Sequence, residues 1–184
     1  MLHLLDYTPE EFRLCCEEHG RPGFLADQVF KWIYGRQVTD FESMTNISKQ
    51  NRAWLRDQTV IFRSRLDQVQ YASDGTLKVL MGWDPPRTDP ADLPVVGQSR
   101  SELKQTETVM IPASRRRTAC VSSQVGCPVG CRFCASGLEG VEGNLTSGQI
   151  MEQILRLSLE DGVGRVSNVV FMGMGEPLHN YGAV

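Results

Sequence analysis

Four of the six cysteines in this 184-residue chain, Cys120, Cys127, Cys131 and Cys134, lie within fifteen residues of one another. Residues 1–11 are mixed and acidic, without the basic and apolar regions of a secretory signal. In a chain without such a signal, clustered cysteines indicate a metal site or redox chemistry before a disulfide framework. We therefore expect a cytoplasmic protein with a metal or redox site at these cysteines.

The overall composition is that of a globular chain. Hydrophobic residues make up 41% and charged residues 22% of the sequence, which excludes collagen, a coiled coil and wholesale disorder. No apolar run approaches the roughly 20 residues that span a bilayer, so an integral membrane protein is also excluded. The formal net charge of −3 neither indicates nor excludes a polyanionic partner, because the local field decides such binding.

Residues 1–66 have the pattern of a small helical accessory domain. Thr8 and Glu11 have the spacing of a capping box, which predicts the start of one helix. A second helix is expected over residues 24–34, where apolar residues recur at helical spacing, and a third after Ser48. Short helices joined by small turns predict a compact all-α module.

Residues 67–112 have a strand-like pattern interrupted by an irregular segment. Residues 69–81 predict a β-hairpin with Asp74-Gly75 in its turn. Proline and glycine are frequent after this hairpin and no periodicity is present, so residues 84–105 are interpreted as an insertion. Strand character resumes at residues 106–112.

Residues 113–184 predict the start of an α/β domain. A strand over residues 118–125 leads into the cysteines, and a second capping box, Thr146 to Gln149, begins a helix. A continuous apolar strand over residues 167–172 completes one β-α-β unit. A parallel sheet needs more strands to bury both faces, so we expect the chain to be part of a longer protein.

The spacing of Cys127, Cys131 and Cys134 is CxxxCxxC. Three thiolates on one short loop can bind three irons of a [4Fe–4S] cluster and leave the fourth iron open to a substrate. A structural zinc site instead needs four protein ligands, commonly from CxxC pairs. Cys120 is available as a fourth thiolate, so the cysteines alone leave both metals open.

A glycine-rich turn, Gly173-Met174-Gly175-Glu176-Pro177, follows the last predicted strand. The cysteine spacing, with Phe133 before the last cysteine and this turn one β-α-β unit later, resembles the radical S-adenosylmethionine superfamily. The resemblance implies that the open iron binds S-adenosylmethionine, which an electron from the cluster cleaves to a 5′-deoxyadenosyl radical. It assigns cofactor binding to Gly175 and Glu176.

Longer stretches narrow this resemblance to the RlmN/Cfr family of RNA adenine methyltransferases. They are Cys120-Val-Ser-Ser-Gln-Val-Gly-Cys127, Gly143-Asn144-Leu145-Thr146 and residues 168–178, with residues 30–34, 40–41, 44–46 and 74–76 similar to the family's N-terminal module. The resemblance implies an α/β fold in which a helical, RNA-docking accessory domain precedes the start of a partial (βα) barrel. It also implies 23S rRNA as substrate, with certain tRNAs as a second target, and an electron donor such as flavodoxin or ferredoxin.

The family resemblance also gives roles to two residues outside the cysteine loop. In this family a cysteine near the C-terminus is methylated first, and its methylene radical adds to the adenine ring. Cys120 matches the second cysteine, which resolves the protein–RNA adduct and leaves a disulfide bond. Glu107 matches the proton acceptor, although from the residues alone a solvated carboxylate is the simpler interpretation.

The methyl-carrying cysteine of the family would follow Val184, so we expect these 184 residues alone to be inactive. Methylation at adenine C2, of the RlmN type, is the favoured reaction, and Cfr-type methylation at C8 is the alternative within the enzyme class. From a different class, a four-cysteine zinc-stabilised RNA-binding module also stays open.

Overall fold

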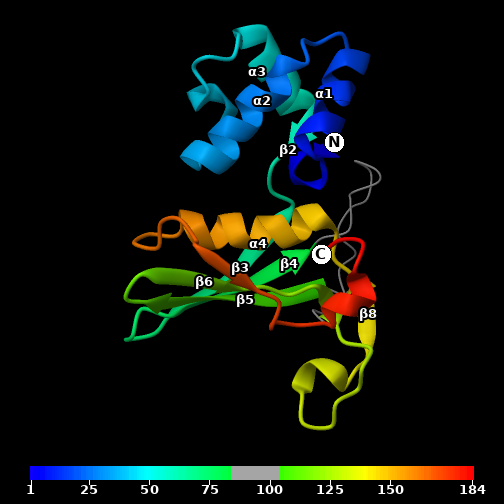
Figure 1. Cartoon of the computed structure of the whole chain (residues 1–184), viewed down its shortest axis with the longest axis vertical. Coiled ribbons are helices and arrows are strands. Elements are labelled where there is room, and N and C mark those ends of the chain that lie inside the picture. Colours follow the sequence, from blue (N-terminus) through cyan, green and yellow to red (C-terminus); the bar gives the residue numbers. More distant parts are fainter. Residues whose placement is uncertain (84–103) are drawn as a thin grey trace, which may run out of the picture. The chain divides into compact units, whose positions relative to one another are not determined.

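The computed structural model describes residues 1–83 and 104–184 (Figure 1). These residues form two compact units, Met1–Phe62 and Arg63–Val184. The predicted insertion at residues 84–105 lies outside the described residues except for Lys104 and Gln105, which already belong to a strand. The mixed α/β class expected from the sequence is confirmed.

The first unit is mainly helical. Its helices are α1 (Pro9–Glu18), α2 (Phe24–Phe30) and α3 (Lys49–Gln58), with short turns η1 (Leu4–Asp6), η2 (Lys31–Gly35) and η3 (Phe41–Ser43). The two ends of the unit pair as short parallel strands, β1 (Leu2–His3) and β2 (Thr59–Val60). The prediction of an all-α module is therefore wrong in this detail. The second predicted helix also changes at Lys31 from α-helical to π-helical geometry.

Local sequence signals explain where these helices begin and what they bury. The Thr8 hydroxyl accepts the Glu11 amide, and the Glu11 carboxylate accepts the Thr8 amide, which completes the predicted capping box. Phe12 on α1 is fully buried and packs against the rings of Phe30 and Trp54. The core of this unit therefore joins all three helices through aromatic contacts.

The second unit is built on a five-stranded sheet with the order β3-β4-β5-β6-β9. Its strands are β3 (Ser64–Tyr71), β4 (Leu77–Trp83), β5 (Lys104–Ala113), β6 (Arg116–Cys120) and β9 (Asn168–Val170). Strands β3 to β6 pair with one another in antiparallel fashion, whereas β9 pairs parallel to β6. Helix α4 (Ser147–Leu159) lies between β6 and β9 along the chain, which confirms the predicted β-α-β unit (Figure 1).

One face of this sheet packs against α4 and the other carries the candidate site. Along β4, Leu77, Val79 and Met81 are fully buried, and they join Ile150 and Leu157 of α4 in one core. Strand residues alternate between faces, so the residues between these three point to the opposite face. The sequence alternation that predicted a hairpin thus sets which side chains face the core.

Two predicted strands differ from the structure. The expected strand over residues 118–125 divides into β6 and a second strand, β7 (Gln124–Gly126), because the chain leaves the large sheet after Cys120. Strand β7 pairs with β8 (Val141–Asn144) in a separate antiparallel ribbon. The expected strand over residues 167–172 is ordered as β9 for only three residues, and the glycine-rich turn follows.

Candidate active site

The three cysteines of the CxxxCxxC motif lie on the loop that joins β7 to β8. Cys127, Cys131 and Cys134 are half-buried and none forms a disulfide bond. The loop begins at Gly126, whose φ of +74° and close approach to the Gly140 carbonyl leave no space for a side chain. Glycine is therefore required where the loop leaves the ribbon.

The donor set on this loop fits an iron–sulfur cluster. Three free thiols lie within eight residues on a loop whose Gly130 has a φ of +66° and open space around it. Within residues 1–83 and 104–184, no three His, Cys, Asp or Glu side chains converge so that they could hold a metal ion. Binding a cluster would thus require the three thiols to turn toward a common centre.

Cys120 is the last residue of β6, and its register with Val109 puts it on the sheet face opposite α4. It lies opposite Val109 on β5 and Val170 on β9, and it is half-buried with a free thiol. Partial burial raises the pKa of this thiol, while a hydrogen bond with the backbone of Met172 lowers it to a smaller extent. Cys120 is therefore favoured in its neutral form.

Glu107 lies on the same face as Cys120. It is two residues from Val109 along β5, which places its Cα on the order of 8 Å from that of Cys120, given usual strand spacings. Its carboxylate accepts a hydrogen bond from the Lys78 ammonium group at 3.0 Å, and both side chains are about half-exposed. The structure thus brings the two predicted chemical residues to one surface.

The glycine-rich turn, Gly173–Pro177, which we call the cofactor turn, packs against the chain segment that follows Cys120. The amides of Ser123 and Gln124 both donate to the Met174 carbonyl, at 2.9 and 3.3 Å. Gly175 has a φ of +98°, and a Cβ there would lie 2.7 Å from the Gln124 backbone nitrogen. Only glycine permits this close approach.

Glu176 follows this glycine at the start of the short helix η6 (Pro177–Asn180). Its carboxylate accepts a hydrogen bond from the Leu178 amide at 3.1 Å, and its own amide donates to the Gln124 side chain at 2.9 Å. The residues fit S-adenosylmethionine by their chemistry, since the Glu176 carboxylate and the backbone carbonyls of the glycine-rich turn can accept hydrogen bonds from the ammonium group of that cofactor. The Ser123 hydroxyl beside Gly175 is buried, with no hydrogen-bond partner in the described part of the chain.

Sequence reasoning missed a set of buried polar residues between the sheet and the cofactor turn. The set is Ser122, Ser123, Gln124, Gln153 and Asn180. Gln153 pairs its side-chain amide with both backbone groups of Ser122, at 2.8 and 2.9 Å, in place of a neighbouring strand. Asn180 donates at 2.8 Å to the carbonyls of both Ser123 and Leu145. The sequence signal that could have indicated these contacts is Gln153, a polar residue on the buried face of α4.

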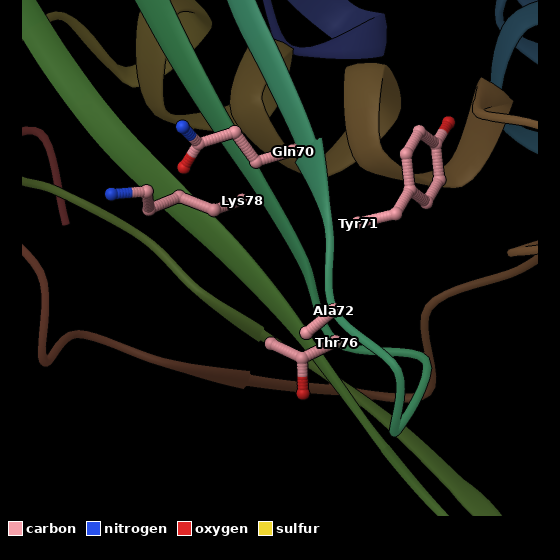
Figure 2. Close-up of a pocket in the computed structure, with 5 residues that line it drawn as sticks. All are labelled: Gln70, Tyr71, Ala72, Thr76 and Lys78. Atoms are coloured by element: carbon pink, nitrogen blue, oxygen red, sulfur yellow. The ribbon is translucent and has the colours of Figure 1, made fainter.

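The described residues of the second unit line at least two hollows. One of about 370 Å³ lies beside the cysteine loop, and its lining includes Leu80, Gly126 and Met174. Figure 2 shows the other, of about 540 Å³, at the hairpin of β3 and β4, where Gln70 and Lys78 project to the same side. Only the first hollow is lined by both the cofactor turn and the base of the cysteine loop, so it is the better candidate for a ligand site.

The fold matches that of a solved radical S-adenosylmethionine methyltransferase. The chain superposes with a TM-score of 0.82 on the crystal structure of a radical SAM methyltransferase from Sphaerobacter thermophilus. Sequence identity to that protein is 33%, and the match covers 100% of this chain and 50% of the other.

Sequence comparisons find relatives of one name among RNA methyltransferases. Residues 2–61 match the family model of the ribosomal RNA large subunit methyltransferase N-terminal domain. The chain is 41% identical over 182 residues to the probable dual-specificity RNA methyltransferase RlmN of Thermotoga neapolitana, covering 98% of this chain and 48% of that protein. It is 42% identical over 185 residues to the protein of the same name from Gloeobacter violaceus, covering 98% and 47%.

These findings show that the chain is similar to RlmN proteins along nearly its whole length, as the resemblance of its motifs predicts. The chain spans about half the length of the curated relatives it matches. Over residues 1–83 and 104–184, no helix combines the length and apolar character needed to cross a membrane.

Proposed function

We propose that these residues form part of a radical S-adenosylmethionine methyltransferase that methylates C2 of an adenosine in 23S rRNA and in tRNAs. The observation that carries this proposal is the junction after Cys120, where hydrogen bonds join the cofactor turn to the β7–β8 ribbon that carries the cysteine loop. The names of the relatives support the RNA methyltransferase activity. Ribosomal and transfer RNA as substrates would support a cytoplasmic location.

Two cofactors are assigned to residues of this chain. Cys127, Cys131 and Cys134 would hold a [4Fe–4S] cluster, and Gly175 and Glu176 would contact S-adenosylmethionine. Together the bound cofactors supply an organic radical able to abstract a hydrogen atom, given one electron from a donor such as flavodoxin or ferredoxin.

Glu107 and Cys120 would act on the RNA adduct at the open face. Once the methylene radical has added to the adenine carbon, the adduct would lose one electron to the cluster, oxidised in the first step, and the hydrogen on that carbon as a proton, which the Glu107 carboxylate would accept. The Cys120 thiolate would then attack the sulfur of the adduct, so that a disulfide forms as the carbon–sulfur bond breaks. The electron pair of that bond would stay on the methylene carbon, which takes up a proton to complete the methyl group. The methyl-carrying cysteine would come from outside these residues.

The position of the methyl group is the finer part of this proposal. C8 methylation of the Cfr type uses the same cysteine and glycine motifs, so the site residues do not separate the two reactions. The relatives at 38–42% identity carry the RlmN name, and this supports C2.

The proposal is tested first by metal content and then by product. Full-length protein purified without oxygen should contain about four irons and four sulfides per chain, and mass spectrometry should find 2-methyladenosine in treated 23S rRNA and tRNA. Cys131→Ser should remove iron and activity, whereas Cys15→Ala, a matched cysteine on α1, should retain both. A single zinc per chain without iron would contradict the proposal and favour the zinc-stabilised module. A methyl group on C8 would contradict only the regiochemistry.

A further inference from the structure

We infer that Gln124 is a positioning residue for the cofactor turn: its side-chain amide fixes the backbone of Glu176 relative to the ribbon that carries the cysteine loop. This inference rests on the proposed function. It goes beyond the residues assigned to the cluster and to the cofactor, because Gln124 lies outside both the CxxxCxxC motif and the cofactor turn.

Both ends of the Gln124 amide are in use. Its Oε1 accepts a hydrogen bond from the Glu176 amide at 2.9 Å, and its Nε2 donates to Asn144 Oδ1 at 2.7 Å. The side chain is buried, with 2% of its surface exposed. A carboxylate could accept the first bond but not donate the second, and an apolar side chain could do neither. The position therefore specifies an amide.

The place of Gln124 in the fold explains why these two side-chain hydrogen bonds matter. Gln124 is the first residue of β7 and pairs with Asn144, the last residue of β8, so the two close one end of the ribbon. The loop bearing Cys127 to Cys134 leaves from the other end of the same ribbon. The Gln124 side chain thus connects the cysteine-bearing ribbon to the cofactor turn through one rigid amide.

Close packing prevents the turn from shifting independently of Gln124. A Cβ on Gly175 would lie 2.7 Å from both the backbone nitrogen and the Cβ of Gln124. Met174, one residue earlier, accepts the Ser123 amide through its carbonyl and donates its own amide to the Ser122 hydroxyl at 2.9 Å. The turn is therefore held by its backbone on one side and by the Gln124 side chain on the other.

Loss of the amide should weaken cofactor binding more than cluster binding. Without Gln124 Oε1, the partly buried Glu176 amide loses its acceptor and the residue is free to move. The three cysteines lie beyond the other end of the ribbon, and their loop keeps its own backbone hydrogen bonds, such as that from the Cys127 amide to the Gly140 carbonyl at 2.9 Å. Residues that orient a ligating group commonly change affinity by about 10–100-fold.

The test measures cofactor binding and iron content in the full-length protein with Gln124→Met, Gln124→Glu and Asn144→Leu. Gln124→Met should raise the Kd for S-adenosylmethionine by about 10–100-fold while iron and sulfide stay at the wild-type level. It should also reduce the change that S-adenosylmethionine causes in the electron paramagnetic resonance spectrum of the reduced cluster. Gln124→Glu and Asn144→Leu each keep the acceptor for Glu176, so their effects should be smaller.

Trp83→Phe is the control for general destabilisation. It removes another buried side-chain hydrogen bond, from Trp83 Nε1 to Thr106 Oγ1 at 2.9 Å, in the sheet core. It should lower the unfolding temperature without changing the Kd for S-adenosylmethionine. If Gln124→Met does not fold, the two milder variants decide by the same measurements.

Three results would overturn the inference. A Kd within threefold of wild type in all three variants would show that the amide does not position the turn. Iron loss in parallel with the loss of S-adenosylmethionine affinity would show only a general structural role. Wild-type protein that binds neither iron nor S-adenosylmethionine would refute the proposed function itself, and the inference with it.

Discussion

The close approach of Gly175 to residues 123 and 124 predicts that Gly175→Ala destabilises the second unit more than an ordinary glycine substitution. An alanine at a φ of +98° costs about 1–2 kcal/mol of backbone strain. Its Cβ would also lie 2.7 Å from Gln124 and from the Ser123 hydroxyl, an overlap worth about 1–3 kcal/mol once neighbours move. The total loss in the free energy of unfolding is therefore about 2–5 kcal/mol.

Gly162→Ala is the matched control, because Gly162 has a φ of +77° but a Cβ added there would meet no atom of the described residues within 4 Å. This variant should lose only the backbone part, about 1–2 kcal/mol. Urea unfolding followed by circular dichroism of the β-sheet measures both, since the five-stranded sheet lies wholly within the second unit. With a slope near 2 kcal/mol per molar urea, the Gly175 midpoint should fall by about 1–2.5 M and the control midpoint by about 0.5–1 M. Equal midpoints would refute the reasoning from close approach.

Three further predictions concern stability. Glu152→Leu should lower the free energy of unfolding in urea by about 3–5 kcal/mol, because the buried Glu152 carboxylate accepts hydrogen bonds from the amides of Arg63 and Ser64 and a leucine cannot accept them. A loss below about 1 kcal/mol would contradict this prediction. Burial raises the pKa of Cys16 to about 11, so the thiol ionises at lower pH in the unfolded state than in the folded state. From pH 9 to 11 the free energy of unfolding of the wild type should therefore fall by up to about 3 kcal/mol relative to Cys16→Ala, whereas parallel pH profiles of the two proteins would contradict this prediction. Thr146→Ala should lower the unfolding free energy by about 1 kcal/mol through loss of the α4 cap, and an unchanged midpoint would show the cap to be redundant.

Local signals in the sequence predicted much of the fold because they act over a few residues. The capping boxes at Thr8 and Thr146 are both present, and each begins the expected helix. The Asp74-Gly75 turn joins β3 to β4, where Gly75 takes a φ of +84°. The predicted hairpin over residues 69–81 is present, and the alternation along β4 places Leu77, Val79 and Met81 in the core with α4. Each of these features depends on neighbours along the chain or on one repeating period.

The site was predicted less completely, because its supporting contacts join distant segments. The motif cysteines, Glu107 and the cofactor turn could be identified by spacing and resemblance alone. The break in the strand over residues 118–125 could not, since Val121 and Gln124 continue the β pattern. The break arises because Gln153 supplies the hydrogen bonds of Ser122 that a neighbouring strand would otherwise supply. That contact spans 31 residues, so the pattern of residues 118–125 alone does not indicate it.

The same break also gives the cofactor turn its place beside the sheet. The Val121 amide still donates to the Val170 carbonyl of β9 at 2.9 Å, and from there on the backbone binds the cofactor turn. The Val121 carbonyl accepts the Gly173 amide at 3.1 Å, and the Ser123 and Gln124 amides donate to the Met174 carbonyl. The Ser122 hydroxyl then joins the Glu107 carbonyl, at 2.7 Å, to the Met174 amide, at 2.9 Å. A buried three-residue detour from the sheet thus links the proton acceptor, the resolving cysteine and the cofactor turn that we propose.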